Sequence, residues 1–238
     1  MKTAITINDQ PVHVPTSWAE ITFGQFIAMK AATTDAETLA ALTGLTLHVC
    51  EQVPPEIAAI IIQPTTAMGD VDPTDAPMIM GKAVSTSIGG MEYARKVNCD
   101  ALPKAYTDEI LVARMVAIYC ADGIEDEDIE QAYLGVLLEP FSEVASAGKL
   151  ISDQLLAMRK GEESIKAPEY ESEEYSAGIN DFKKYGVFGL VRGIALRHHC
   201  TKEDVFRWSY NSVILELRYS ADESAYQRKS NKILSRKK

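Results

Sequence analysis

Residues 185–238 read YGVFGLVRGIALRHHCTKEDVFRWSYNSVILELRYSADESAYQRKSNKILSRKK, and this stretch decides the expected fold. Apolar residues at helical spacing predict a first helix that ends near His198. The spacing of Thr201 and Asp204 is that of a capping box and predicts the start of a second helix, which a basic tail follows. This order is typical of a helical module that docks on another protein. No local catalytic motif accompanies it in the sequence.

The second of these helices is expected to carry apolar residues on two faces. One stripe contains Val205, Trp208 and Leu215, and the other contains Phe206, Tyr210, Val213 and Leu217. Two apolar stripes predict two packing surfaces. Either both pack inside the helix's own domain or one receives a partner, and we expect Trp208 to be buried in both cases. The candidate partner-binding residues are Phe206, Trp208, Tyr210, Val213, Leu217, Arg228, Lys229 and Lys232.

The basic tail contrasts with the rest of an acidic chain. Six cations fall within the last eleven residues, where no acid occurs, while the chain as a whole has a formal charge of -10. The acidic balance argues against general nucleic-acid binding, because a phosphate backbone is held by clustered Lys and Arg. The tail is either a solvated helix end or a contact for an acidic partner surface.

Composition and motifs indicate a globular protein without a metal or cofactor site. The 238 residues are 46% hydrophobic and 24% charged, as in ordinary globular domains. The four cysteines, Cys50, Cys99, Cys120 and Cys200, form no C-x-x-C pair, so we expect buried free thiols. Adjacent side chains on a helix point about 100° apart, so His198 and His199 are poorly placed to share one ion with Cys200.

The sequence also predicts neither an export signal nor a membrane span. The start, MKTAITINDQPVHVP, has no long apolar core and no small-residue cleavage site, so we expect no signal peptide. No apolar run approaches the roughly 18 residues needed to cross a bilayer. We therefore expect a cytoplasmic protein that does not bind membranes.

The order of elements predicts a mainly α protein with small β-hairpins, an α+β fold, in four segments. Residues 1–65 are expected to form a hairpin over 3–14 and short helices beginning near Thr22, Thr34 and Pro54, with Gly44 ending the second. Residues 66–160 begin with a loop and continue with a hairpin that pairs 78–84 with 91–97, followed by a helical body from Thr107. An acidic linker at 161–179 precedes a separable helical docking module at 180–238.

Both ends of the chain resemble a known class of viral proteins. The opening hairpin followed by VPTSWAEITFGQF at 14–26, the helical middle and the terminal VFRWSYNSVILELRYSADESAYQRK at 205–229 resemble small phage morphogenesis proteins, most nearly the tail assembly chaperones of long-tailed bacteriophages. The resemblance implies an acidic, helical, non-catalytic protein that coats the tape measure protein and recruits tail tube subunits. The resemblance also implies that the protein acts in the cytoplasm of the infected bacterium.

Two other classes of function stay open from the sequence. A structural component of the virion, such as a connector, neck or baseplate protein, would have a similar composition and would stay with the particle. An enzyme is the last hypothesis, since its polar residues would have to converge from distant positions without any local motif. The expected partners are therefore the tape measure protein, the tail tube protein or a second copy of the chain in an oligomer.

Overall fold

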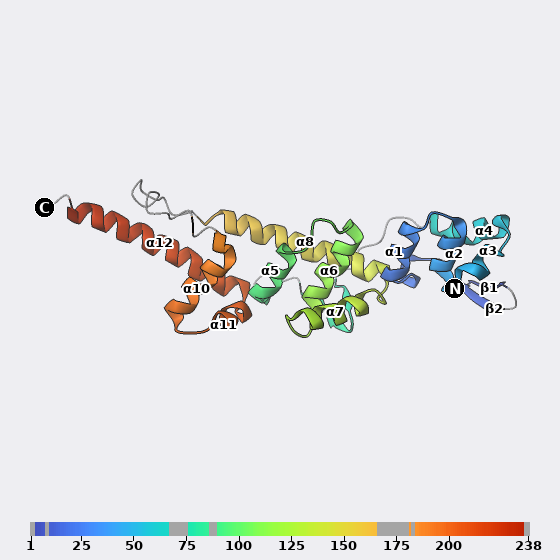
Figure 1. The fold of residues 1–238 in the computed structure, drawn as a ribbon, viewed down its shortest axis with the longest axis horizontal. Coiled ribbons are helices and arrows are strands. Elements are labelled where there is room, and N and C mark those ends of the chain that lie inside the picture. Colours follow the sequence, from blue (N-terminus) through green and yellow to red (C-terminus); the bar gives the residue numbers. More distant parts are fainter. Residues whose placement is uncertain are drawn as a thin grey trace. The chain divides into compact units, whose positions relative to one another are not determined.

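The computed structural model describes residues 3–7, 10–66, 76–85, 90–165, 181 and 184–235. This part of the chain contains eleven α-helices, one 3₁₀-helix and two antiparallel two-stranded sheets, which confirms a mainly α fold with small hairpins. Most of the expected acidic linker and most of the loop before residue 78 lie outside the described residues. Figure 1 labels the helices and strands along the chain, which divides into two compact units. Unit 1 is Met1–Ser85 with Ala101–Ser152, and unit 2 is Thr86–Asp100 with Asp153–Lys238.

Unit 1 combines both hairpins with most of the short helices. Its strands are β1 (Thr3–Ile7), β2 (Gln10–Val14), β3 (Met78–Ile79) and β4 (Lys82–Ala83). Its helices are η1 (Trp18–Glu20), α1 (Phe23–Ala31), α2 (Asp35–Thr43), α3 (Leu47–Glu51), α4 (Pro55–Thr66), α6 (Asp108–Cys120) and α7 (Asp126–Val136). Helix α8 (Phe141–Glu163) contributes its residues up to Ser152 to this unit and the rest to unit 2.

The helices near the N-terminus begin and end where local signals place them. Thr22 and Thr34 each form a complete capping box, with Gln25 and Glu37 at the third helical position. Gly44 ends α2 in the left-handed conformation at φ 72°, which glycine adopts without steric cost. Helix α2 packs against β2, α3 and α4, and the shared core is apolar. This core consists of Ile7, Val12, Val14, Leu39, Cys50, Ala58 and Ile61.

Backbone contacts and aromatic rings join the start of α1 to the start of α8. The backbone N–H of Phe23 donates to Glu139 at 2.8 Å, and that of Phe141 donates to Ile21 at 2.7 Å. The rings of Phe23 and Phe141 stack with centroids 5.7 Å apart. At Gly24 a Cβ atom would lie 2.9 Å from the Leu137 carbonyl oxygen, so only glycine allows this approach.

The second hairpin is shorter than the sequence predicted. Strands β3 and β4 pair directly across Met80 and Gly81, whose φ angles of 50° and 72° are those of a two-residue hairpin turn. The expected partner strand at 91–97 lies instead in α5 (Tyr93–Asp100), so the predicted pairing of 78–84 with 91–97 is wrong. The buried residues of α5 include Tyr93, Lys96 and Cys99, which recur at helical spacing.

The described residues of unit 2 form five helical segments, taken from two stretches of the chain. They are α5, the second part of α8, α10 (Gly186–His198), α11 (Lys202–Arg207) and α12 (Tyr210–Ser235). Helix α11 packs between α5 and α10, and its Phe206 ring stacks on Tyr93 with centroids 6.4 Å apart. Of the four cysteines, Cys50, Cys99 and Cys120 are buried free thiols, as expected, and Cys200 is half-buried. Burial raises the pKa of the Cys99 thiol to about 12.

A buried lysine joins α5 to α8 within unit 2. Lys96 Nζ lies 2.7 Å from Asp100 Oδ2 and 2.8 Å from Glu162 Oε1. Arg159 Nη2 binds the other oxygen of Asp100 at 2.9 Å. Burial lowers the pKa of Lys96, but the hydrogen bonds to the two carboxylates outweigh burial and leave the pKa above its ordinary value.

Candidate docking surface on α12

The second helix predicted from the sequence is interrupted at Trp208 and Ser209. Trp208 has an extended backbone at ψ 153°, and its carbonyl accepts a hydrogen bond from Tyr93 N–H at 2.9 Å. Tyr210 N–H then donates to Met91 at 2.7 Å, and Ser209 Oγ accepts from Ser212 N–H at 3.3 Å. The prediction of one continuous helix with two stripes is therefore wrong. The capping spacing of Ser209 and Ser212 was the sequence signal for this break.

The aromatic candidates before the break pack against unit 2 itself. Phe206 is half-buried between Tyr93 and Phe188, whose ring meets it edge-on with centroids 6.0 Å apart. Trp208 is half-buried rather than fully buried as expected, and it contacts the His198 ring at 5.1 Å. Both side chains therefore stabilise the corner where α11 ends.

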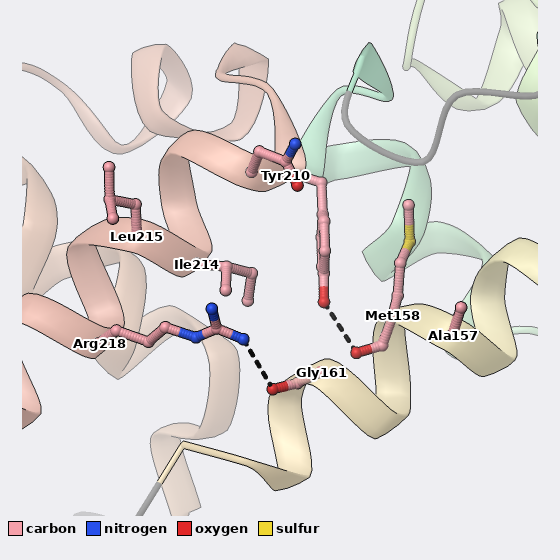
Figure 2. Close-up of a pocket in the computed structure, with 8 residues that line it drawn as sticks. Ala157, Met158, Gly161, Tyr210, Ile214, Leu215 and Arg218 are labelled. Atoms are coloured by element: carbon pink, nitrogen blue, oxygen red, sulfur yellow. Dashed lines mark hydrogen bonds between the residues drawn. The ribbon is translucent and has the colours of Figure 1, made fainter.

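The candidates at the start of α12 are core residues. Tyr210 is 4% exposed and Val213 is also buried, while Leu217 is half-buried. The Tyr210 hydroxyl donates a hydrogen bond to the Met158 carbonyl at 2.9 Å (Figure 2). Burial raises the pKa of Tyr210 far above its ordinary value. A partner protein cannot reach Tyr210 and Val213 in this state.

A pocket opens between the end of α8 and the first turns of α12. Its volume is about 410 Å³. It is lined by Ala157, Met158, Gly161, Tyr210, Asn211, Ile214, Leu215 and Arg218 (Figure 2). Met158, Ile214 and Leu215 give it apolar walls, and the Tyr210 hydroxyl is engaged with a backbone carbonyl. The pocket therefore suits an apolar side chain of a partner.

Arg218 lines this pocket and also binds the C-terminal end of α8. Its Nη2 lies 3.4 Å from the Gly161 carbonyl and 3.3 Å from Ser164 Oγ, and Figure 2 shows the guanidinium turned toward Gly161. The Gly161 carbonyl is one of the last four of α8, which lack partners within the helix. A cation at a helix C-terminus is also favoured by the helix dipole. Arg218 thus fixes α12 on α8 beside the pocket.

An exposed apolar stripe runs from the pocket along α12. Leu215, Tyr219, Tyr226 and Ile233 recur at intervals of four, seven and seven residues, which places them within about 40° of each other on one face. Each of the four is at least 57% exposed. Leu215 also lines the pocket, so the two features are continuous. We call these four residues the α12 stripe, and at 1.5 Å per residue it is about 27 Å long.

Ion pairs from α10 reach α12 as far as Glu223, about halfway along the helix. Arg197 of α10 lies 3.7 Å from Glu216 and 3.3 Å from Glu223, and His198 lies 3.0 Å from Glu216. The buried residues of α12 are Tyr210, Val213 and Ile214, all in its first two turns. Among the predicted basic residues, Lys229 and Lys232 are exposed and Arg228 is half-buried. Residues 236–238 lie outside the described residues.

Other candidate chemistry is sparse in the described ranges. Within them, no three His, Cys, Asp or Glu side chains are grouped so that they could hold a metal ion. Across the same ranges, none of the helices is both long and apolar enough to cross a membrane. A search for similar proteins gives no match to a family model, a curated protein or a solved structure.

Proposed function

We propose that this protein is a non-catalytic assembly protein that binds a helical segment of another protein through the α12 stripe. The observation that carries the proposal is that α12 extends 26 residues although its buried residues end at Ile214. A helix is stabilised mainly by packing an apolar face, yet among the described residues of α12 none beyond Ile214 is buried, and the apolar side chains of the α12 stripe are exposed. A partner helix laid along the stripe would supply this packing, with the pocket at Leu215 receiving its anchor side chain.

The class of assembly protein is inferred from the resemblance of both chain ends to phage tail assembly chaperones. On this proposal the protein acts in the cytoplasm of an infected bacterium and binds the tape measure protein, the tail tube protein or both. The stripe and its basic neighbours Lys229 and Lys232 support such a role, because they suit an acidic amphipathic helix. The alternative is a structural component of the virion.

Replacing Tyr226 with alanine is expected to weaken capture of the tape measure or tail tube protein about 30-fold. Exposed aromatic anchors that a partner buries commonly contribute 2 kcal/mol or more to binding. Binding of the purified tape measure protein from the same genome, measured by biolayer interferometry, tests this. Gln227→Ala is the matched control, because Gln227 is the exposed neighbour about 100° around the helix.

Equal capture by Tyr226→Ala and Gln227→Ala would refute the stripe as the docking surface, provided that both variants keep the wild-type thermal midpoint. Mass spectrometry of purified particles separates the two proposed classes. A chaperone is expected to be absent from finished virions, whereas a connector, neck or baseplate protein would be present in stoichiometric amount.

A further inference from the structure

Positive and negative charges are unequally divided between the two units. Unit 1 holds 6 Lys and Arg against 19 Asp and Glu, a formal charge of -13, and unit 2 holds 18 against 15, a charge of +3. The two values add up to the chain's -10. Unit 1 of one molecule therefore attracts unit 2 of another, and complementary fields of this kind steer association.

Unit 1 also carries an exposed apolar face within its acidic surface. Leu134, near the end of α7, and Leu138, in the turn that follows α7, lie four residues apart and are each more than half exposed. The first turn of the same helix carries Asp126, Glu127 and Asp128. We call Leu134, Leu138 and Glu127 the α7 face. The helix and the turn after it thus present two leucines for burial next to carboxylates for charge pairing.

The α12 stripe has the complementary composition. Tyr226 and Ile233 are exposed on it, and Lys229 and Lys232 lie between them along the helix. A contact of α12 with α12 in a second copy would bring like charges together, which is unfavourable. A contact of α12 with α7 pairs lysine with glutamate while it buries tyrosine and isoleucine against leucine.

We propose that the α12 stripe of one copy docks on the α7 face of a second copy, so that the chain associates head to tail. This inference rests on the proposed function, which assigns the stripe as a docking surface. It adds that a second copy of the chain occupies the stripe until a partner protein binds. Because the two surfaces differ, each contact leaves one stripe and one α7 face open, and further copies can add. A partner protein and a second copy then compete for the same stripe.

Complementation between two full-length variants tests the proposal. Tyr226→Glu disrupts docking through the α12 stripe and leaves the α7 face intact. The double variant Glu127→Lys with Leu134→Lys disrupts the α7 face and leaves the α12 stripe intact. At low salt the wild type is expected to grow in mass with concentration in sedimentation velocity, while each variant alone sediments as one chain of 26.2 kDa. An equimolar mixture of the two variants is expected to form a species of two chains that does not grow further.

Controls separate the local contact from net charge and from folding. Gln227→Glu adds a carboxylate beside Tyr226, and Asp126→Lys makes the same charge change as Glu127→Lys about 100° around α7; both are expected to associate like the wild type. Raising the salt to 1 M shortens the screening length from about 10 to 3 Å and is expected to dissociate the wild type. Circular dichroism confirms that each variant is folded.

Several outcomes would overturn the proposal. A wild type that stays monomeric at every concentration in low salt excludes self-association, and a double variant that dimerises alone shows contact of α12 with α12. Capture of the tape measure protein by a wild type that does not self-associate would refute this inference and leave the proposed function intact. Self-association without any such capture would refute the proposed function alone.

Discussion

Substitution of Tyr210 by alanine is expected to lower the free energy of unfolding of unit 2 by about 3 to 5 kcal/mol, as for other buried aromatic residues. The side chain is 4% exposed, and its hydroxyl donates to the Met158 carbonyl at 2.9 Å. Alanine would leave a cavity between α12 and α8 at the wall of the pocket and would also remove the hydrogen bond. Urea unfolding followed by circular dichroism measures the change through the midpoint and the slope.

Tyr210→Phe is the matched variant for this position. It keeps the ring and loses only the hydrogen bond, so a loss of about 0.5 to 1.5 kcal/mol is expected. If alanine and phenylalanine destabilised the protein equally, the ring would not be packed as described. The result also distinguishes a core residue from a binding residue. Replacement of Tyr210 is expected to lower stability, whereas replacement of Tyr226 is expected to weaken capture and leave the thermal midpoint unchanged.

Substitution of Lys96 by methionine is expected to cost about 3 kcal/mol of stability, the lower end of the range for breaking a buried ion pair. The lysine side chain is 8% exposed, and methionine keeps its apolar stem. The cost stays at the lower end because the Asp100 and Glu162 side chains, 32% and 29% exposed, retain contact with water. Arg159→Met is the control: Arg159 is more exposed, and its loss is expected to cost under about 1 kcal/mol.

Because of the same ion pairs, the stability of the fold is expected to fall at acidic pH. Burial raises the pKa of Asp100, but hydrogen bonds from Lys96 and Arg159 outweigh it and hold the pKa below its ordinary value of 3.8. The carboxylate therefore stabilises the fold above that value, and the contribution is lost as the pH falls through the lower folded pKa. Urea midpoints of the wild type should fall more steeply below pH 4 than those of Asp100→Asn. Parallel curves would contradict this account.

Local signals predicted most helix boundaries because each boundary depends on neighbouring residues. The capping boxes at Thr22, Thr34 and Thr201 need only a side chain and an amide three residues on, and all three are formed. The helix at Tyr93 and the break at Trp208 were missed for a common reason. The Tyr93 N–H binds the Trp208 carbonyl, and no spacing within either segment reveals a pairing between residues so distant in sequence.

The sequence predicted which helix carries the candidate surface, but it did not predict which face of that helix is exposed. Phe206 and Tyr210 were assigned to one stripe because an uninterrupted helix was assumed from Thr201. When the helix begins at Tyr210, its exposed face carries Tyr219 and Tyr226 instead. Spacing alone does not say which apolar face packs inside unit 2, since that depends on where α5 and α8 lie. This information is absent from the terminal sequence.

The discontinuous composition of unit 2 has a consequence for synthesis on the ribosome. Met91 and Tyr93 are made about 120 residues before Tyr210, whose amide binds Met91. At roughly 5 to 20 residues per second, the nascent α5 waits about 6 to 24 s for the segment that covers it. Prematurely released chains therefore expose the apolar face of α5, and a gene fragment starting at codon 180 encodes Trp208 and Tyr210 without the backbone groups that bind them.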